Sequence, residues 1–165
     1  MSIITIQQRT AQHADLRQLI AELDEDLLLR YPPELIHGMD LDHPDVENNT
    51  FMVAYVDDQP AGCGAIRKLD EQYTELKRFF VHGTYRRQGI ASRLLQALES
   101  AAVEQGFMGI RLETGIKQQE AMAFYERNGY VPIKLFGEYI GEEQSRCYEK
   151  MPLQPIGDDV QHVGN

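Results

Sequence analysis

The segment Arg86-Arg87-Gln88-Gly89-Ile90-Ala91 constrains the fold of this chain more than any other. It joins the strand-like residues 75–81 to residues 90–105, whose apolar side chains recur with helical spacing. The first N–H groups of a helix lack intrahelical partners and carry partial positive charge. The two arginines add full charges, and the glycine lets a ligand approach the backbone closely. The pattern predicts a phosphate or pyrophosphate site at the start of this helix.

The charge distribution agrees with an anionic ligand at this place. The chain has a net charge of −10, yet residues 61–93 carry seven basic and three acidic residues. A positive island in an acidic chain suits a polyanionic cofactor, whereas nucleic-acid binding usually requires a basic domain. The glycine fingerprints of dinucleotide-binding folds and of phosphate loops are both absent from the sequence.

The chain of 165 residues fits one domain, and its 42% hydrophobic and 25% charged residues are ordinary for a globular protein. No apolar run approaches the roughly 20 residues of a membrane span, and the first residues lack a signal-peptide pattern. We therefore expect a cytoplasmic protein without membrane contact. Cys63 and Cys147 are expected to be buried thiols rather than a disulfide. Residues 1–153 are the predicted domain, and residues 154–165 a disordered tail.

The order of secondary structure indicates an α/β fold around a mixed, mostly antiparallel sheet. The predicted strands are residues 3–6, 51–56, 61–66, 73–81, 110–113, 130–133 and 145–151, and the predicted helices residues 15–29, 90–105 and 118–128. Pro132 predicts that its strand lies at an edge of the sheet, because proline cannot donate to a strand ladder.

Two motifs in this order resemble those of the GCN5-related N-acetyltransferase superfamily. The pyrophosphate motif of that family, Q/R-x-x-G-x-G/A, is matched by Arg86, Gly89 and Ala91. Its helix motif, A-x-x-L/F-Y-x-x-x-G-F/Y, is matched by Ala121, Phe124, Tyr125, Gly129 and Tyr130. The resemblance implies a single-domain fold whose twisted sheet is flanked by helices and splayed at the cofactor site.

The resemblance also implies acetyl-CoA as acetyl donor. The histidines lack metal-ligand spacing, so no metal cofactor is expected. The residues implied in binding acetyl-CoA are Phe80, Val81, Arg86, Arg87, Gln88, Gly89, Ile90, Ala91, Ser92 and Gln118. The strand over residues 75–81 is expected to bulge near its end and to expose N–H groups that polarise the thioester carbonyl. Many members have asparagine where this chain has Gln118.

Two residues are implied to be catalytic. Tyr125 would protonate the departing thiolate, although a core aromatic residue would occupy the same helix face. Glu75 stands six residues before Val81, as does the general base of the histone-acetylating branch, but a solvated strand residue explains it equally well. His82 and Glu113 are rival bases.

The resemblance implies direct attack by an amine on acetyl-CoA in a ternary complex. The acidic residues of segment 24–47 would wall the acceptor side of the cleft and attract a cationic amine, although a solvated acidic surface explains them too. The sequence does not distinguish a small-molecule amine from a protein amine as the acceptor. Members of the family often form homodimers, so a homodimer is also expected from the resemblance. Two other functions remain: a non-catalytic acyl-CoA-binding module, and a protein that binds another nucleotide.

Overall fold

The computed structural model describes residues 2–86 and 88–154. The strands are β1 (Ile4–Arg9), β2 (Thr50–Val56), β3 (Gln59–Lys68), β4 (Tyr73–Val81), β5 (Gly109–Gly115), β6 (Val131–Ile133) and β7 (Ser145–Lys150). The helices are α1 (Ala14–Leu28), α2 (Ile90–Glu104) and α3 (Gln119–Arg127). Short 3-10 helices are η1 (Pro33–Leu35), η2 (Pro44–Asn48), η3 (Gly83–Tyr85) and η4 (Gly137–Tyr139). The predicted tail, apart from Gln154, lies outside the described residues.

The strands form one sheet in the order β1-β2-β3-β4-β5-β7-β6. In the described sheet only β4 and β5 are parallel, and every other neighbouring pair is antiparallel. The predicted mixed, mostly antiparallel sheet is therefore confirmed. So is the edge position of Pro132, because β6 ends the sheet. The placement of β7 between β5 and β6 was not predictable from local pattern.

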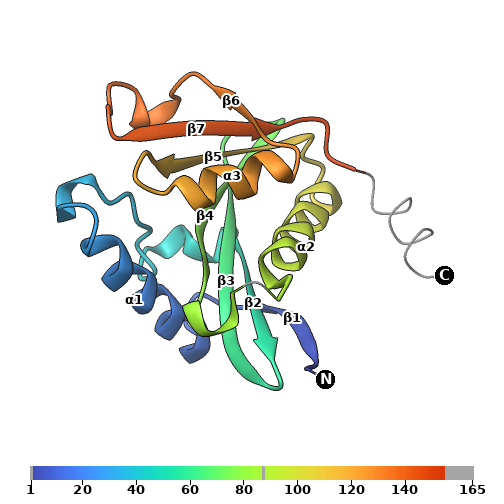
Figure 1. The fold of residues 1–165 in the computed structure, drawn as a ribbon. Coiled ribbons are helices and arrows are strands. Elements are labelled where there is room, and N and C mark those ends of the chain that lie inside the picture. The colour runs from blue at the N-terminus through green and yellow to red at the C-terminus, as the bar shows by residue number, and fades with distance from the viewer. Residues whose placement is uncertain (1, 87, 155–165) are drawn as a thin grey trace.

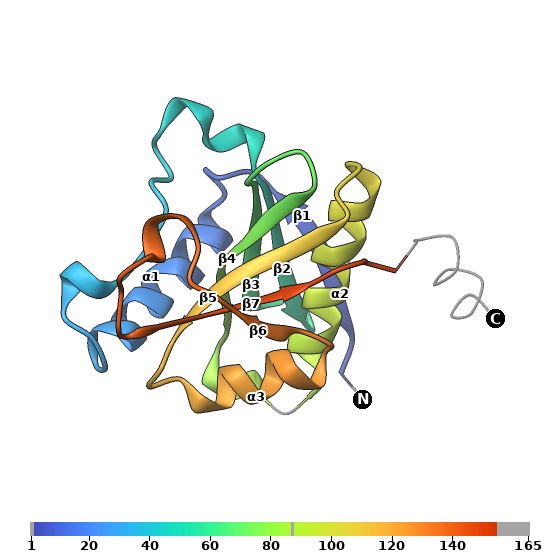
Figure 2. The ribbon, with the colours of Figure 1, turned by 90° about the horizontal axis from the view of Figure 1, so that it is seen from above.

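Helices cover both faces of the sheet (Figures 1 and 2), with α1 on one face and α2 on the other. The apolar stripe of α1 packs on β2 and β3 through Leu16, Leu19 and Leu23. The stripe of α2 packs on the opposite face, in one cluster with Tyr125 of α3. Two hydrophobic layers therefore hold the central strands from both sides.

The centre of the sheet is forked. Parallel pairing of β4 with β5 ends at Leu76 and Leu112, and the two strands then separate. On its other side β4 stays paired with β3 to its end, with a bulge between Lys77 and Phe80. Arg78 within the bulge has a φ of +55°, in the left-handed region. The fork is the predicted splay, and the bulge lies near the end of β4, as expected, just before the residues Phe80 and Val81.

Candidate active site

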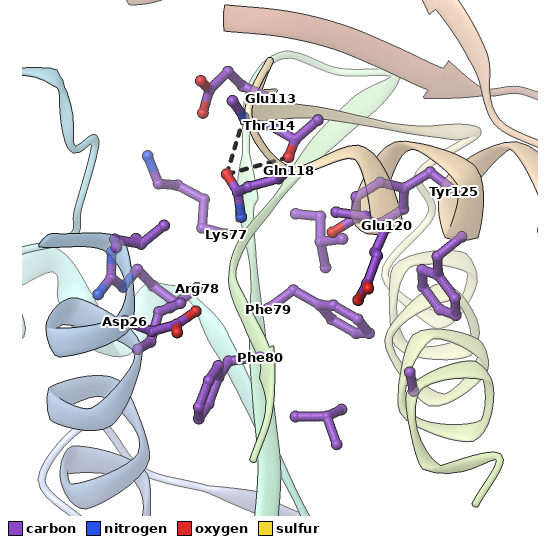
Figure 3. A pocket seen from close by; sticks show the side chains of 18 of the residues that line it. Asp26, Lys77, Arg78, Phe79, Phe80, Glu113, Thr114, Gln118, Glu120 and Tyr125 are labelled. Atoms are coloured by element: carbon purple, nitrogen blue, oxygen red, sulfur yellow. Dashed lines mark hydrogen bonds between the residues drawn. The ribbon is translucent and has the colours of Figure 1, made fainter. Parts of the chain in front are cut away.

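A cavity of about 640 Å³ lies at the fork. One half, which we call the α2 side, is lined by residues of β4, α2 and α3, among them Phe79, Val81, Gly89, Glu120 and Tyr125. The other half, the α1 side, is lined by residues from the α1 region, β4, β5 and η4, among them Leu27, Tyr31, Lys77, Arg78, Glu113 and Tyr139. Figure 3 shows β4 running between the two halves.

The α2 side contains the helix start that the sequence singled out. Gly89 is the N-cap of α2 with a φ of +78°, and a β-carbon there would meet no atom within 4 Å. In the described structure, no side chain caps this helix and no acidic residue lies in its first turn. Arg86 lies beside it, with its Nε donating to the Val81 carbonyl oxygen at 3.0 Å. An open, uncapped helix start with a neighbouring guanidinium fits a phosphate group.

Most of the predicted cofactor residues meet at this cavity. Those that line it are Phe80, Val81, Arg86, Gly89, Ile90, Ala91, Ser92 and Gln118. Gln88 is exposed and does not line it, and Arg87 lies outside the described residues. The Gln118 Oε1 accepts the Gly115 N–H at 3.0 Å and the Thr114 hydroxyl at 3.4 Å, so this amide shapes the turn before α3 (Figure 3).

Tyr125 lines the cavity from α3 while its ring is buried among aromatic neighbours. Its centroid lies 5.5 Å from that of Phe124 and 5.8 Å from that of Tyr130. Burial raises the pKa of the Tyr125 hydroxyl, and the Glu113 charge adds to the rise. The hydroxyl therefore keeps its proton at neutral pH and can act as a donor. Tyr125 is therefore both a residue of the hydrophobic core and a lining residue of the cavity.

Glu75 is not a solvated strand residue, since it is only 1% exposed. Its carboxylate accepts the Tyr139 hydroxyl at 2.5 Å and the Arg67 guanidinium at 2.8 Å. It does not itself line the cavity, whereas Tyr139 does. A carboxylate held by two donors behind the cavity wall is placed to position its neighbours rather than to reach a substrate.

Of the two rival bases, only Glu113 lines the cavity. Burial raises the pKa of its carboxyl, although the Ser145 hydroxyl donates to it at 2.7 Å and opposes the rise. His82 instead uses Nδ1 to accept the Thr84 N–H, and its Nε2 lies 3.4 Å from Glu22. Glu113 is therefore better placed than His82 to take a proton inside the cavity.

The α1 side is closed by a contact between segments far apart in sequence. The Tyr31 hydroxyl accepts the backbone N–H of Lys117 at 3.0 Å. A β-carbon at Gly115 would overlap that hydroxyl, so glycine is required there. Asp26, from the acidic segment 24–47, also lines the cavity. The other residues of this segment that line the cavity are Leu27, Arg30, Tyr31, Leu35, Ile36 and His37, so an acidic wall from this segment stays a prediction that only Asp26 represents in the described lining.

Sequence reasoning missed Lys77 and Arg78 as lining residues. Successive residues of a regular strand point to opposite faces, but the bulge breaks this alternation and both side chains lie on the α1 side (Figure 3). Arg78 pairs with Asp24 of α1. The one available signal was the pair of adjacent cations at the end of a strand expected to bulge.

Cys63 and Cys147 are free and buried, as expected, and burial raises the pKa of Cys63 to about 12. Within residues 2–86 and 88–154, no three His, Cys, Asp or Glu side chains are grouped to hold a metal ion. The helices among those residues include none that is long and apolar enough to cross a membrane.

Comparison with known proteins agrees with this geometry. Residues 15–130 match the model described as the acetyltransferase (GNAT) family. A protein named IAA acetyltransferase from Azospirillum brasilense is 36% identical over 158 residues, which cover 93% of this chain and all of that protein.

Solved structures share the fold over 62–92% of this chain in the two cases that follow. A protein from Klebsiella pneumoniae, described as an acyl-CoA N-acyltransferase, has a TM-score of 0.76 and 31% identity, with 92% of this chain and 99% of that chain covered. A Bacillus anthracis protein, described as a streptothricin acetyltransferase and crystallised with acetyl coenzyme A, has a TM-score of 0.56 and 25% identity over 62% of each chain. With a family model that spans most of its length and relatives that match it nearly end to end, this chain belongs to the GNAT family of acetyltransferases.

Proposed function

We propose that this protein transfers the acetyl group of acetyl-CoA to a primary amine, by direct attack in a ternary complex. The observation that carries the proposal is the fork between β4 and β5. It gathers an uncapped helix start, the protonated Tyr125 hydroxyl and the Glu113 carboxyl of raised pKa around one cavity. These are an anion site, an acid and a base.

The α2 side suits the phosphates of acetyl-CoA. The backbone of residues 89–92 and the guanidinium of Arg86 would hold them, and Gln118 stands where many family members place an asparagine against the cofactor. The proposed binding set also keeps Arg87 and Gln88. The N–H groups around Phe80 and Val81, at the free edge of β4, would polarise the thioester carbonyl.

When bound, acetyl-CoA supplies a thioester whose acetyl carbon passes from sulfur to nitrogen. Glu113 accepts one proton from the acceptor ammonium, which frees the lone pair that forms the N–C bond. Tyr125 donates its proton to the leaving sulfur as the C–S bond breaks, and the second proton lost by the nitrogen restores the phenol. Glu113 then releases its proton to solvent.

We assign the base to Glu113 rather than to Glu75 because of where the two carboxyls lie. Glu75 is held behind the wall by Arg67 and Tyr139, so its oxygens are already occupied. Glu113 reaches the cavity, and its raised pKa brings its basicity nearer to neutral pH. Glu75 remains the alternative that mutation must exclude.

The test combines binding with turnover. Acetyl-CoA at a hundred times its Kd should stabilise the protein by about 2.7 kcal/mol, whereas ATP and NAD should not. The protein should then release CoA thiol from acetyl-CoA when a panel of primary amines is added. If acetyl-CoA stabilises the protein but no amine causes release of CoA thiol, the protein is a non-catalytic acyl-CoA-binding module. Stabilisation by ATP or NAD in place of acetyl-CoA would refute the proposal outright.

A further inference from the structure

The α1 side of the cavity contains a cation and a carboxylate from two neighbouring strands. Leu76 and Leu112 are the last paired residues of β4 and β5, so Lys77 and Glu113 are the first residues beyond the fork on neighbouring strands. Both line the cavity, and both side chains extend to the α1 side (Figure 3). The described ion partners of Lys77 within 4.0 Å are Glu75 and Glu138, not Glu113. The two charged ends therefore line the same half of the cavity without forming an ion pair, and each influences the pKa of the other.

The Lys77 ammonium is buried but incompletely hydrogen-bonded. Its side chain is only 3% exposed, and its described hydrogen bond is to the Tyr139 hydroxyl at 3.2 Å. Glu75 and Glu138 each lie 4.0 Å away, beyond hydrogen-bond distance. An ammonium has three donors, and a buried donor without a partner is costly. Lys77 therefore has unfilled capacity for an anion that enters the cavity.

The two carboxylates near Lys77 have closer partners of their own. Arg67 donates to Glu75 at 2.8 Å, and His37 lies 3.3 Å from Glu138. Burial lowers the pKa of Lys77, and the Glu75 charge opposes this shift. Arg78, the neighbouring cation, is already paired with Asp24. Lys77 is thus the buried cation of the α1 side that can take a ligand carboxylate.

We propose that the acceptor is an α-amino acid with an apolar side chain. This inference rests on the proposed acetyl transfer and names its substrate class. The carboxylate of the amino acid would bind Lys77 while its ammonium faces Glu113, so that one zwitterion meets both charges. The side chain would lie against the apolar residues of the same half, which are Leu23, Leu27, Leu35 and Ile36.

The test compares acceptors that keep the benzyl side chain and the primary amine but change the carboxylate, each at the same concentration of free amine. L-phenylalanine is measured against L-phenylalaninamide and 2-phenylethylamine, with L-glutamate as the test of the apolar pocket. The kcat/KM of the wild-type protein should be about 10- to 100-fold higher for phenylalanine than for its amide, the contribution of a charged hydrogen bond. Glutamate should be a poor acceptor.

Lys77→Met keeps the length and apolar stem of the side chain but removes the charge. It should bring the phenylalanine-to-amide ratio close to one, chiefly by raising the KM for phenylalanine. Lys68→Met is the matched control, because Lys68 is an exposed β3 residue that pairs with Glu71 outside the cavity. The control should keep the wild-type ratio.

Three results would overturn this proposal. One is a wild-type protein that acetylates the amide or 2-phenylethylamine at least as well as phenylalanine. Another is a folded Lys77→Met protein whose phenylalanine-to-amide ratio of kcat/KM is unchanged. If Lys77→Met does not fold, Lys77→Gln is measured in its place. The comparison of acceptors with the wild-type protein requires neither variant. The third is a lack of transfer to any amine, which would refute acetyl transfer as well. Transfer only to amines without a carboxylate would refute the substrate class alone.

Discussion

The two halves of the cavity are built in opposite ways. The α2 side joins one continuous stretch, from the end of β4 through the start of α2, to α3, and its candidate phosphate site is the backbone at the start of α2. The α1 side is assembled from α1, β4, β5 and η4, which are far apart in sequence, and it offers side chains. A site made of local backbone can serve one constant ligand, whereas a site made of distant side chains can change its ligand without changing the fold.

Gly89→Glu should have the largest effect on function, because Gly89 lies on the α2 side where the backbone would come closest to the phosphates of acetyl-CoA. The new side chain adds bulk and negative charge at the proposed phosphate site, so acetyl-CoA binding should be lost, which isothermal titration calorimetry would measure. Gly106→Glu is the matched control, since Gly106 also has a positive φ, of +91°, and open space, but at the other end of α2. Normal acetyl-CoA affinity in folded Gly89→Glu would remove the phosphate assignment.

Tyr125→Phe should have the second largest effect, because it removes the proposed proton donor and leaves the packed ring in place. We expect kcat to fall by roughly 10²–10⁴, with acetyl-CoA affinity nearly unchanged. Single-turnover kinetics would separate the chemical step from product release. Tyr130→Phe is the control: it also removes a buried hydroxyl, which donates to Glu99 at 2.8 Å, but outside the cavity lining. A full chemical rate in Tyr125→Phe would return Tyr125 to a purely structural role.

Glu113→Gln tests the α1 side. It should lower kcat/KM by about 10²-fold, which is the low end of the rate loss on removing a positioned general base. Because the pKa of Glu113 is raised, the wild-type rate should rise with pH through a value above the roughly 4.3 of an ordinary glutamate, and this limb should vanish in the variant. A pH profile of kcat/KM with a fixed amine would measure it. An unchanged profile in Glu113→Gln would direct attention back to Glu75.

The stability of the same variant provides its control. A raised folded-state pKa means that the stabilising contribution of Glu113 is present below its unfolded pKa and lost as pH rises through the folded value. At neutral pH Glu113→Gln should therefore be at least as stable as the wild-type protein in thermal unfolding. A large loss of stability there would mean that the rate was lost through misfolding.

Glu75→Gln should have the smallest catalytic effect and a clear structural one. The variant weakens the charged hydrogen bonds from Arg67 and Tyr139, so the free energy of unfolding should fall by about 1.5–3 kcal/mol. Its rate per folded molecule should stay within a few-fold of the wild-type rate. Denaturant titration and steady-state kinetics on the same preparation would show both. If Glu75→Gln reproduced the pH profile expected for Glu113→Gln, Glu75 would be the base.

The contrast between the α2 side and the α1 side of the cavity explains which features could be predicted from the sequence. Patterns within about ten residues gave the strands, the helices and the start of α2 at Gly89, because helix caps and turns depend on neighbouring residues. The edge position of Pro132 followed from its missing N–H. The insertion of β7 beside β5 could not be predicted, since strand pairing across the chain leaves no local signal.

The positions of individual side chains in the site could not be predicted from local sequence either. The spacing of Glu75 from Val81 is compatible with a base, but only the pairing of Glu75 with Arg67 and Tyr139 showed that it lies behind the cavity wall. Lys77 looks like any strand residue until the fork beside it opens the cavity that it lines.

The sequence by itself determined the elements of this protein, the anion-binding start of α2 and its family motifs, because these depend on short-range spacing and backbone chemistry. The tertiary structure alone decided which side chains share the cavity. The fork between β4 and β5 opened a cavity that both Lys77 and Glu113 line, and burial shifted the pKa values of both side chains. Burial and charge proximity are properties of the folded chain, since they arise only when distant segments exclude water together.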